Sequence, residues 1–295
     1  MGHLICKTAR LVAVGGVAVL TALQTSAAPN CDPGALTVRA DRIANYMPFG
    51  EQAETINIRI DGTAESACRV TFRLSSGTGG DLLQRENRLE VVIRTRQGRR
   101  LDPGGDDQAV VTLLPANANG VSADLIAVLP PRQAVAPGLY EGAFELEVVS
   151  DDHGNQRAQF SLAALVPSQA DIRLAGKNGG PGGRGVDFGV LESGLEETAF
   201  VSVRSNGSYT VELESRNGWF LERDGSDTFN AKIAYSTWFN DFSVPSQSVA
   251  RVPENYEPTG QKGKLNRLRF RIGDTTGKPA GVYQDTVRLT VILLE

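Results

Sequence analysis

Short runs of alternating apolar and polar residues recur along almost the whole chain. In residues 55–60 the apolar positions are Ile56, Ile58 and Ile60, and residues 68–74 repeat the alternation. This period of two is typical of half-buried β-strands, and no stretch shows a sustained helical period with caps. The sequence therefore predicts an all-β protein of many short strands, most simply a sandwich. Further strands are predicted at residues 89–93, 110–114, 144–148, 160–166, 200–203, 209–213, 265–272 and 286–293.

The pattern occurs twice, which indicates two copies of one β domain. Ala136-Pro-Gly-Leu-Tyr140 and Pro279-Ala-Gly-Val-Tyr283 each lead into a strand, and Phe-Gly pairs occur early in both copies, at 49–50 and 188–189. In each copy a strand is expected to end 11 residues before the tyrosine. A chain of 295 residues has room for about two domains. We expect the first domain at residues 28–166 and the second at 167–295.

The two tyrosines, Tyr140 and Tyr283, each follow a turn glycine at the start of a late strand. A tyrosine in that place can send its hydroxyl back to the preceding backbone, as in the tyrosine corner of immunoglobulin-like sandwiches. The alternative is an ordinary half-buried strand aromatic. Both interpretations are structural, and together with the strand count they predict two immunoglobulin-like β-sandwich domains.

The first 27 residues resemble an export signal. Lys7 and Arg10 precede an uncharged, mostly apolar run at residues 11–23, and Thr25-Ser26-Ala27 offers small residues for cleavage. The run is shorter than the roughly 20 residues that span a bilayer, although an uncleaved anchor is the alternative. No later stretch is long and apolar enough to span. We expect a signal peptide at residues 1–27 and a mature protein outside the cytoplasm.

Removal of the signal leaves 28 basic residues against 34 acidic ones, a net charge of −6. An acidic exported chain is a poor candidate for binding nucleic acid. Cys31 and Cys68 would then be the only cysteines, and in an oxidising compartment they most simply form a disulfide. Two free thiols are the alternative.

Residues suited to catalysis or metal binding are scarce. The chain has two histidines, His3 and His153, and three cysteines, so a His/Cys metal cluster or a histidine-based triad is not expected. The sequence predicts no cofactor, no metal and no enzymatic activity.

The second copy resembles the spore coat protein U domain. The similarity covers residues 186–292 and is carried by Val186-Asp-Phe-Gly189, by residues 202–211 and above all by residues 279–291. It implies the subunit fold of archaic chaperone–usher pili, an immunoglobulin-like sandwich that lacks its last strand and receives one from a neighbouring subunit. Ser205 stands where a cysteine is usual in that family, so the second copy lacks the family's disulfide.

The order of strands tests what that resemblance implies. In the first copy, residues 156–166 form a further strand after the tyrosine strand, so this copy can complete itself. The second copy ends with its tyrosine strand, and Val287, Leu289, Val291 and Leu293 should form the edge that accepts a donated strand. Only three residues precede Cys31 in the expected mature chain, too few for a donor segment. A subunit that accepts but does not donate belongs at the end of a fibre.

Two aromatic groups have no clear role in the sequence. Trp219 and Trp238 are expected in the core of the second copy, with a contact between subunits as the alternative. Tyr46 and Met47, beside Phe49, could form an apolar surface loop that contacts a receptor.

The leading hypothesis is an exported, adhesive subunit of an archaic chaperone–usher pilus, at the tip or in another minor position, that serves adhesion or biofilm formation. Its expected partners are a periplasmic chaperone, an outer-membrane usher, a neighbouring pilin subunit and an unknown surface receptor. Two alternatives are a periplasmic pilus chaperone, which also has two immunoglobulin-like domains, and an exported carbohydrate-binding module.

Overall fold

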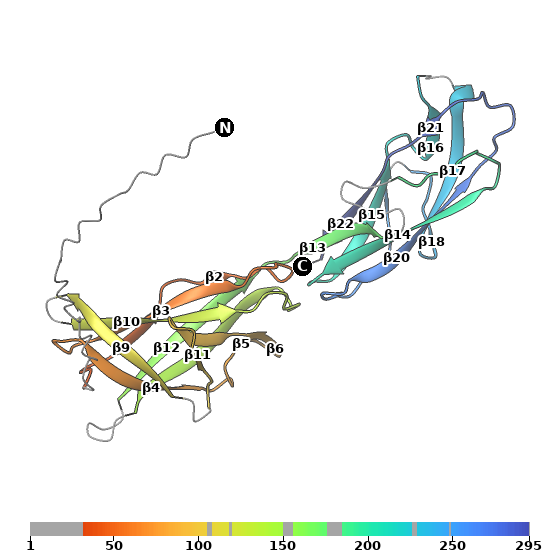
Figure 1. The fold of residues 1–295 in the computed structure, drawn as a ribbon. Helices are drawn as coiled ribbons and strands as arrows, with labels where there is room; N and C mark the ends of the chain where they lie inside the picture. Colours follow the sequence, from red (N-terminus) through yellow and green to blue (C-terminus); the bar gives the residue numbers. More distant parts are fainter. Residues whose placement is uncertain are drawn as a thin grey trace, which may run out of the picture.

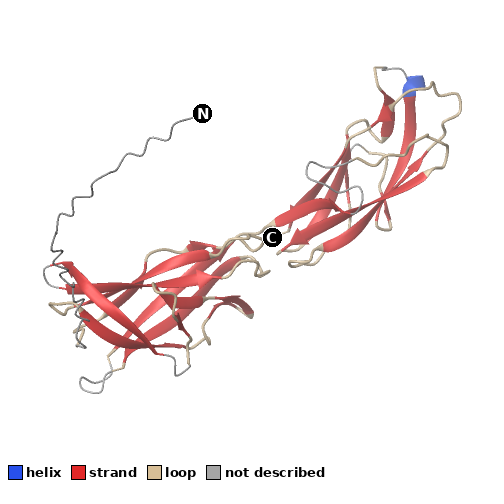
Figure 2. Cartoon of the chain, in the orientation of Figure 1, coloured by secondary structure: helices blue, strands red, loops and turns tan. Residues whose placement is uncertain are grey.

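The computed structural model describes residues 32–104, 108–117, 120–149, 156–175, 185–225, 229–247 and 249–294. Its strands fall into two groups that lie end to end, with the C-terminus near the junction (Figure 1). Strands β1 to β12 pair only with one another, and so do β13 to β22. The fold is almost entirely β, with one short 3₁₀ turn at Phe229–Ala231 (Figure 2). The prediction of two immunoglobulin-like β-sandwich domains is therefore confirmed.

The first domain is one curled sheet in the order β1-β3-β10-β9-β4-β11-β12-β2, with the small strands β5 to β8 attached at its sides. The sheet curls so that its inner face encloses a continuous apolar core, in which Ile56, Ile58, Ile60 and Phe72 are fully buried. Because strand side chains alternate in direction, the polar residues between the isoleucines face solvent. The strands are β1 (Thr37–Ala40), β2 (Ala44–Asn45), β3 (Glu54–Gly62), β4 (Cys68–Ser76), β5 (Asp81–Gln84), β6 (Asn87–Glu90), β7 (Val92–Thr95), β8 (Arg100–Leu101), β9 (Gln108–Asn117), β10 (Gly120–Leu129), β11 (Gly138–Val148) and β12 (Arg157–Val166).

Strand β12 occupies the place that the sequence assigned to a closing strand. It pairs antiparallel with β11 along nearly its whole length, from Gly138 opposite Val166 to Glu147 opposite Arg157. Its other edge pairs with β2 near the start of the domain. The inward residues Ala158, Phe160, Leu162 and Ala164 are all buried. The first domain thus has a filled core on both sides of β11.

The second domain consists of separate sheets. One has the order β13-β14-β20-β17-β16-β21, and the other has the order β19-β15-β22. Its core includes Val201, Val203, Tyr209 and Phe239. The strands are β13 (Ala170–Ala175), β14 (Glu196–Ser205), β15 (Tyr209–Ser215), β16 (Phe220–Arg223), β17 (Lys232–Phe239), β18 (Phe242–Ser243), β19 (Val249–Arg251), β20 (Lys264–Ile272), β21 (Tyr283–Gln284) and β22 (Val287–Leu293).

Every strand that the alternation predicts is present, and the structure adds others that were not predicted, among them β1, β13 and β16. Residues 89–93 contain two strands, because Val91 separates β6 from β7. Strand β17 was not predicted, although Ile233, Tyr235 and Phe239 all point inward, because Thr237 interrupts their apolar series. Among the described residues, no helix is long and apolar enough to cross a bilayer.

Candidate functional site

Strand β22 is paired on one edge only. All seven of its residues pair with β15, from Val287 opposite Ser215 to Leu293 opposite Tyr209. No other described strand pairs with it. Strand β13 is likewise an edge strand, paired only with β14. The two sheets of the second domain are therefore unconnected along this side, and each presents unpaired backbone groups there.

A groove of about 1280 Å³ lies between these two edges. Its lining is mostly apolar and comes from β13, the segment before β14, the strands of the larger sheet and β22. The lining residues are Ile172, Arg173, Leu174, Gly185, Val186, Phe188, Val201, Leu221, Tyr235, Leu268, Phe270, Tyr283, Gln284, Asp285, Thr286, Val287 and Leu289. A partly solvated apolar groove beside two strand edges has the chemistry to bind an extended peptide with alternating apolar residues.

The predicted acceptor edge reaches the groove at Val287 and Leu289, and Val291 and Leu293 follow on the same strand beyond its lining. Val287, Leu289, Val291 and Leu293 pack against the core yet remain partly exposed. They alternate with Arg288 and Thr290, which face solvent. The corresponding inward residues of β11 are only 0–3% exposed; they are Tyr140, Phe144, Leu146 and Val148. The same pattern of residues is thus covered in one domain and open in the other.

One end of the groove is held by Asp285, which separates β21 from β22. Its carboxylate accepts hydrogen bonds from the Ser215 hydroxyl at 2.6 Å, from the Asn217 backbone N–H at 3.1 Å and from the Tyr235 hydroxyl. Burial, with a further contribution from Asp285, raises the pKa of Tyr235, so this phenol stays a protonated donor. The network fixes where β22 begins.

Both predicted tyrosine corners have the expected hydrogen bond. The hydroxyl of Tyr140 donates to the carbonyl of Ala136 at 2.8 Å, and that of Tyr283 donates to the carbonyl of Pro279 at 2.7 Å. Tyr140 is fully buried, whereas Tyr283 lines the groove. Burial raises the pKa of Tyr140.

The two tryptophans differ in burial. Trp219 is buried in the core, meets Tyr235 edge-on at 5.9 Å, and its indole N–H donates to the carbonyl of Gln247. Trp238 is only half-buried, and the Arg269 guanidinium lies 4.4 Å from the centre of its ring. The core placement predicted for both is therefore right for Trp219, while Trp238 lies at the surface under an arginine.

The two domains meet at a polar joint that the sequence did not reveal. Its centre is Asn206, a side chain that is 3% exposed. Its amide nitrogen donates to the carbonyl of Val135 in the first domain and to that of Pro167 in the linker, while its oxygen accepts from the backbone N–H of Gln169 at 2.7 Å. One buried amide therefore binds the first domain, the linker and the second domain.

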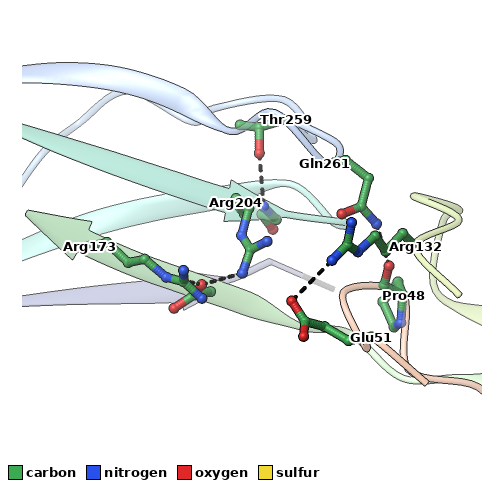
Figure 3. A network of polar contacts seen from close by, with 9 residues as sticks. Pro48, Glu51, Arg132, Arg173, Arg204, Thr259 and Gln261 are labelled. Carbon is green, nitrogen blue, oxygen red and sulfur yellow. Dashed lines mark hydrogen bonds and ion pairs between the residues drawn. The ribbon is translucent and has the colours of Figure 1, made fainter. Parts of the chain in front are cut away.

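Charged and aromatic groups surround this amide. Arg204 donates to the carboxylate of Asp171 at 2.6 Å, and its guanidinium lies 5.2 Å from the centre of the Phe49 ring. Figure 3 shows Arg204 and Arg173 converging on one carboxylate, with Gln261 reaching toward Pro48 of the first domain. Burial alone would raise the pKa of Asp171, but the hydrogen bonds and charges of Arg204 and Arg173 outweigh it and lower that pKa.

The structure contradicts the prediction that Tyr46 contacts a receptor. Tyr46 is 0% exposed, because its hydroxyl lies within the first domain, donating to the carbonyl of Pro130 and accepting from the backbone N–H of Gln133. It is not available to a receptor. Met47 is 45% exposed, but the neighbouring Pro48 carbonyl accepts a hydrogen bond from Gln261 of the second domain. Tyr46 thus has the hydrogen-bond partners that a buried aromatic hydroxyl needs within the first domain, and Pro48 links the loop to the second domain.

The remaining sequence predictions concern cysteines and metals. Cys68 begins β4 and is fully buried, whereas Cys31 lies outside the described residues, so the disulfide stays a prediction. His153 and the signal segment, residues 1–27, also lie outside them. Within the described ranges, no group of three or more histidine, cysteine, aspartate or glutamate residues could hold a metal ion.

Comparisons with known proteins find similarity in structure only. No family model matches the sequence, and no curated protein sequence matches it significantly, so the resemblance to the spore coat protein U domain stays a prediction. The similar solved structures include several adhesive pilus or fimbrial subunits and tip adhesins. One is the CsuC–CsuE complex of chaperone and tip adhesion subunit from archaic Csu pili of Acinetobacter baumannii. It is 16% identical, the match covers 87% of this chain and 99% of that one, and the TM-score is 0.49.

Two further structures are less similar. CfaE, the adhesive subunit of CFA/I fimbria of enterotoxigenic Escherichia coli, is 10% identical over 89% of this chain and 93% of its own, with a TM-score of 0.37. The CupB6 tip adhesin of Pseudomonas aeruginosa is 8% identical over 87% and 94%, with a TM-score of 0.34. At these identities and TM-scores the likenesses do not decide the function, which depends on the geometry of this chain.

Proposed function

We propose that this protein is a non-enzymatic, strand-accepting subunit of an archaic chaperone–usher pilus, exported through the periplasm to the cell surface. The observation that carries the proposal is the groove between β13 and β22, with an apolar floor and an unpaired backbone edge on each side. A β-strand that entered it would satisfy those backbone groups and bury the half-exposed row that begins at Val287. In this account a periplasmic chaperone and later a neighbouring pilin supply the strand, and an outer-membrane usher assembles the fibre.

The first domain supplies a template for the missing strand. There β12 lies beside β11 in the antiparallel sense and places an apolar residue at every second position toward the core. A donor beside β22 would need the same alternation, since a shift of one residue would turn its apolar side chains to solvent. Each side chain that becomes fully buried contributes about 1.5–3 kcal/mol before the cost of ordering the donor.

The position of the joint predicts in which direction a donated strand would run beside β22. Strand β22 runs toward the joint, because Leu294 bonds to Ser208 and the Cβ position of Gly207 lies 3.8 Å from Pro137 of the first domain. The first domain therefore stands at that end of the groove, and the body of a donor subunit must lie at the other end. A donor strand at the N-terminus of its own subunit would then run antiparallel to β22, and this chain would occupy the end of the fibre, with the first domain outermost.

Thermal unfolding of the full chain with added peptides tests this proposal. A peptide of about ten residues with apolar side chains at alternate positions, taken from the N-terminus of a cognate pilin, should raise the Tm of the second domain by binding linkage. The matched control is the same peptide with aspartate at two of its inward positions, which should have no effect. An equal response to both peptides, or no response to either, would contradict strand acceptance.

The same experiment separates this proposal from the two other classes. A pilus chaperone has complete domains and lends a strand to its client, so it would gain no stability from a pilin donor peptide. A carbohydrate-binding module would respond to sugars and not to the peptide. The apolar lining of the groove favours strand acceptance over both.

A further inference from the structure

Four arginines crowd one hairpin on the outer face of the first domain. The hairpin joins β7 to β8, and its sequence from Arg94 to Arg100 is Arg-Thr-Arg-Gln-Gly-Arg-Arg. We call the four side chains Arg94, Arg96, Arg99 and Arg100 the arginine hairpin. All four are exposed, whereas Thr95 between them is buried. The hairpin therefore presents its charge to solvent and holds itself to the sheet by the intervening residue.

Part of this charge has no counterion among the residues that the structure describes. Arg96 pairs with Asp124 at 2.7 Å, and Arg100 pairs with Asp102. Arg94 and Arg99 form no ion pair with any described residue. Like charges directly opposite each other on neighbouring strands are destabilising, and Arg94 stands directly opposite Arg100. Folding alone gains nothing from this arrangement.

A second like-charge pair on the same face shows how the fold neutralises such a contact. Arg39 on β1 stands opposite Arg59 on β3, but Asp61 lies between them and accepts from both, at 3.2 and 2.8 Å. No such carboxylate bridges Arg94 and Arg100. The sheet thus has one arginine pair bridged by a shared carboxylate and, on the far side of β10, a pair in which Arg100 has Asp102 but Arg94 forms no ion pair with a described residue.

The residue type points to the chemistry of a ligand. Residues 28–166 contain 13 arginines and no lysine, whereas residues 167–295 contain five lysines. A guanidinium forms two parallel hydrogen bonds with a sulfate, phosphate or carboxylate group, which an ammonium cannot do. The outward neighbours of Arg94 on β10 and β3 are Ile126 and Asn57, and neither offers an aromatic ring for stacking nucleic-acid bases.

We propose that the arginine hairpin binds an acidic polysaccharide, a polymer that presents sulfate or carboxylate groups at regular spacing. The chain as a whole is acidic, with a net charge of −4, so long-range attraction is weak and the contact depends on short-range bidentate bonds. The strand groove lies in the other domain. This site therefore does not depend on the pilus proposal, and either can fail without the other.

Binding of the full chain to heparin, a sulfated polysaccharide, tests this inference, with neutral dextran as the reference. Heparin should bind and dextran should not, and affinity should fall as salt rises. The variant Arg94→Gln/Arg99→Gln should lose about tenfold in affinity. The control Arg69→Gln/Arg88→Gln removes the same charge from exposed strand positions on β4 and β6 and should bind as the unmodified chain does. Equal losses in both variants, or none in either, would overturn the proposal.

A charge-conserving variant separates bidentate recognition from simple attraction. Arg94→Lys/Arg99→Lys keeps the positive charge but removes the planar guanidinium that makes two parallel hydrogen bonds. We expect its affinity for heparin to lie between those of the unmodified chain and the glutamine variant. Single-stranded DNA and vesicles containing phosphatidylglycerol are the competing polyanions. If either binds as tightly as heparin and loses the same fold in the glutamine variant, the site is a general anion surface and the polysaccharide assignment is wrong. Unchanged Tm values show that the variants remain folded.

Discussion

The two domains share a pattern of strands and differ at one edge. In the first, β11 lies between β4 and β12, and its inward residues are fully covered. In the second, β22 has β15 on one side and a groove on the other, and its inward residues remain half-exposed. Nearly the same alternation of residues therefore gives a finished core in one domain and an unfinished one in the other. The partner strand, and not the strand itself, makes the difference.

Separating the domains should have the largest effect. Residues 28–166 contain β12 and should unfold cooperatively as a fragment. Residues 167–295 should lack a cooperative transition when alone, because two unpaired edges and an open apolar groove remain exposed. Circular dichroism melts of the two fragments measure this difference. Cooperative melting of the second fragment without an added peptide would show that its core is already complete.

An aspartate introduced on β12 of the first domain, and another on β22 of the second, compare how well the two strands are covered. Leu162 on β12 is fully buried, so Leu162→Asp should destabilise the first domain by more than about 3 kcal/mol and reduce secretion of folded protein. Leu289 on β22 is half-exposed, so an aspartate side chain at this position can still contact water. Leu289→Asp should therefore lower the free energy of unfolding by only about 1 kcal/mol. The second variant should nevertheless lose all response to the donor peptide. Urea titration of both chains gives the two costs, and equal costs would mean that the edges are equally covered.

The joint between the domains should respond to the loss of one amide. Asn206→Ala leaves the carbonyl of Pro167 and the N–H of Gln169 without their partner, at a cost of about 1–3 kcal/mol. Spin labels placed one in each domain should then show a broader distance distribution. Asn255→Ala, at an exposed position of the same domain, is the matched control and should leave the distribution unchanged. A narrow distribution in both variants would mean that Asn206 does not hold the joint.

Lowering the pH should reduce the stability of the second domain through protonation of Asp171, and this is the smallest of the predicted effects. Its pKa is lowered in the folded chain, so it contributes stability above its unfolded pKa of about 3.9, and this contribution is lost as pH falls through the folded value. Asp171→Asn should therefore lower the Tm at pH 7 and reduce the fall in Tm between pH 5 and pH 2. Asp241→Asn is the control, since that side chain is 97% exposed. A pH profile that is the same in all three proteins would refute the role of Asp171.

Much of the fold could be predicted because its signals are local. Alternation locates strands, and a glycine two residues before a tyrosine predicts the corner bonds of Tyr140 and Tyr283. The joint could not be predicted, because Asn206 acts on Val135 and Pro167, which lie 71 and 39 residues away in the sequence. Tyr46 illustrates the same limit. Its neighbours suggest a surface loop, and only tertiary structure brings Pro130 to its hydroxyl.

The closing strand of the first domain could be predicted and the arginine hairpin could not. The alternation after Tyr140 predicts β12, which pairs with β11, whereas among the described residues β22 pairs only with β15. The four arginines are visible in the sequence, but their meaning depends on which strand faces which. Only the register places Arg94 opposite Arg100 without a bridging carboxylate.

Hydrogen–deuterium exchange of the full chain, with and without the pilin donor peptide, tests the central claim most directly. Strand acceptance predicts that the peptide slows exchange in two segments far apart in the sequence, 170–175 of β13 and 287–293 of β22. Residues 138–148 of β11, already paired on both edges, should exchange at the same rate in both conditions. Unchanged exchange in the two groove segments, at a peptide concentration that saturates any binding, would contradict the account.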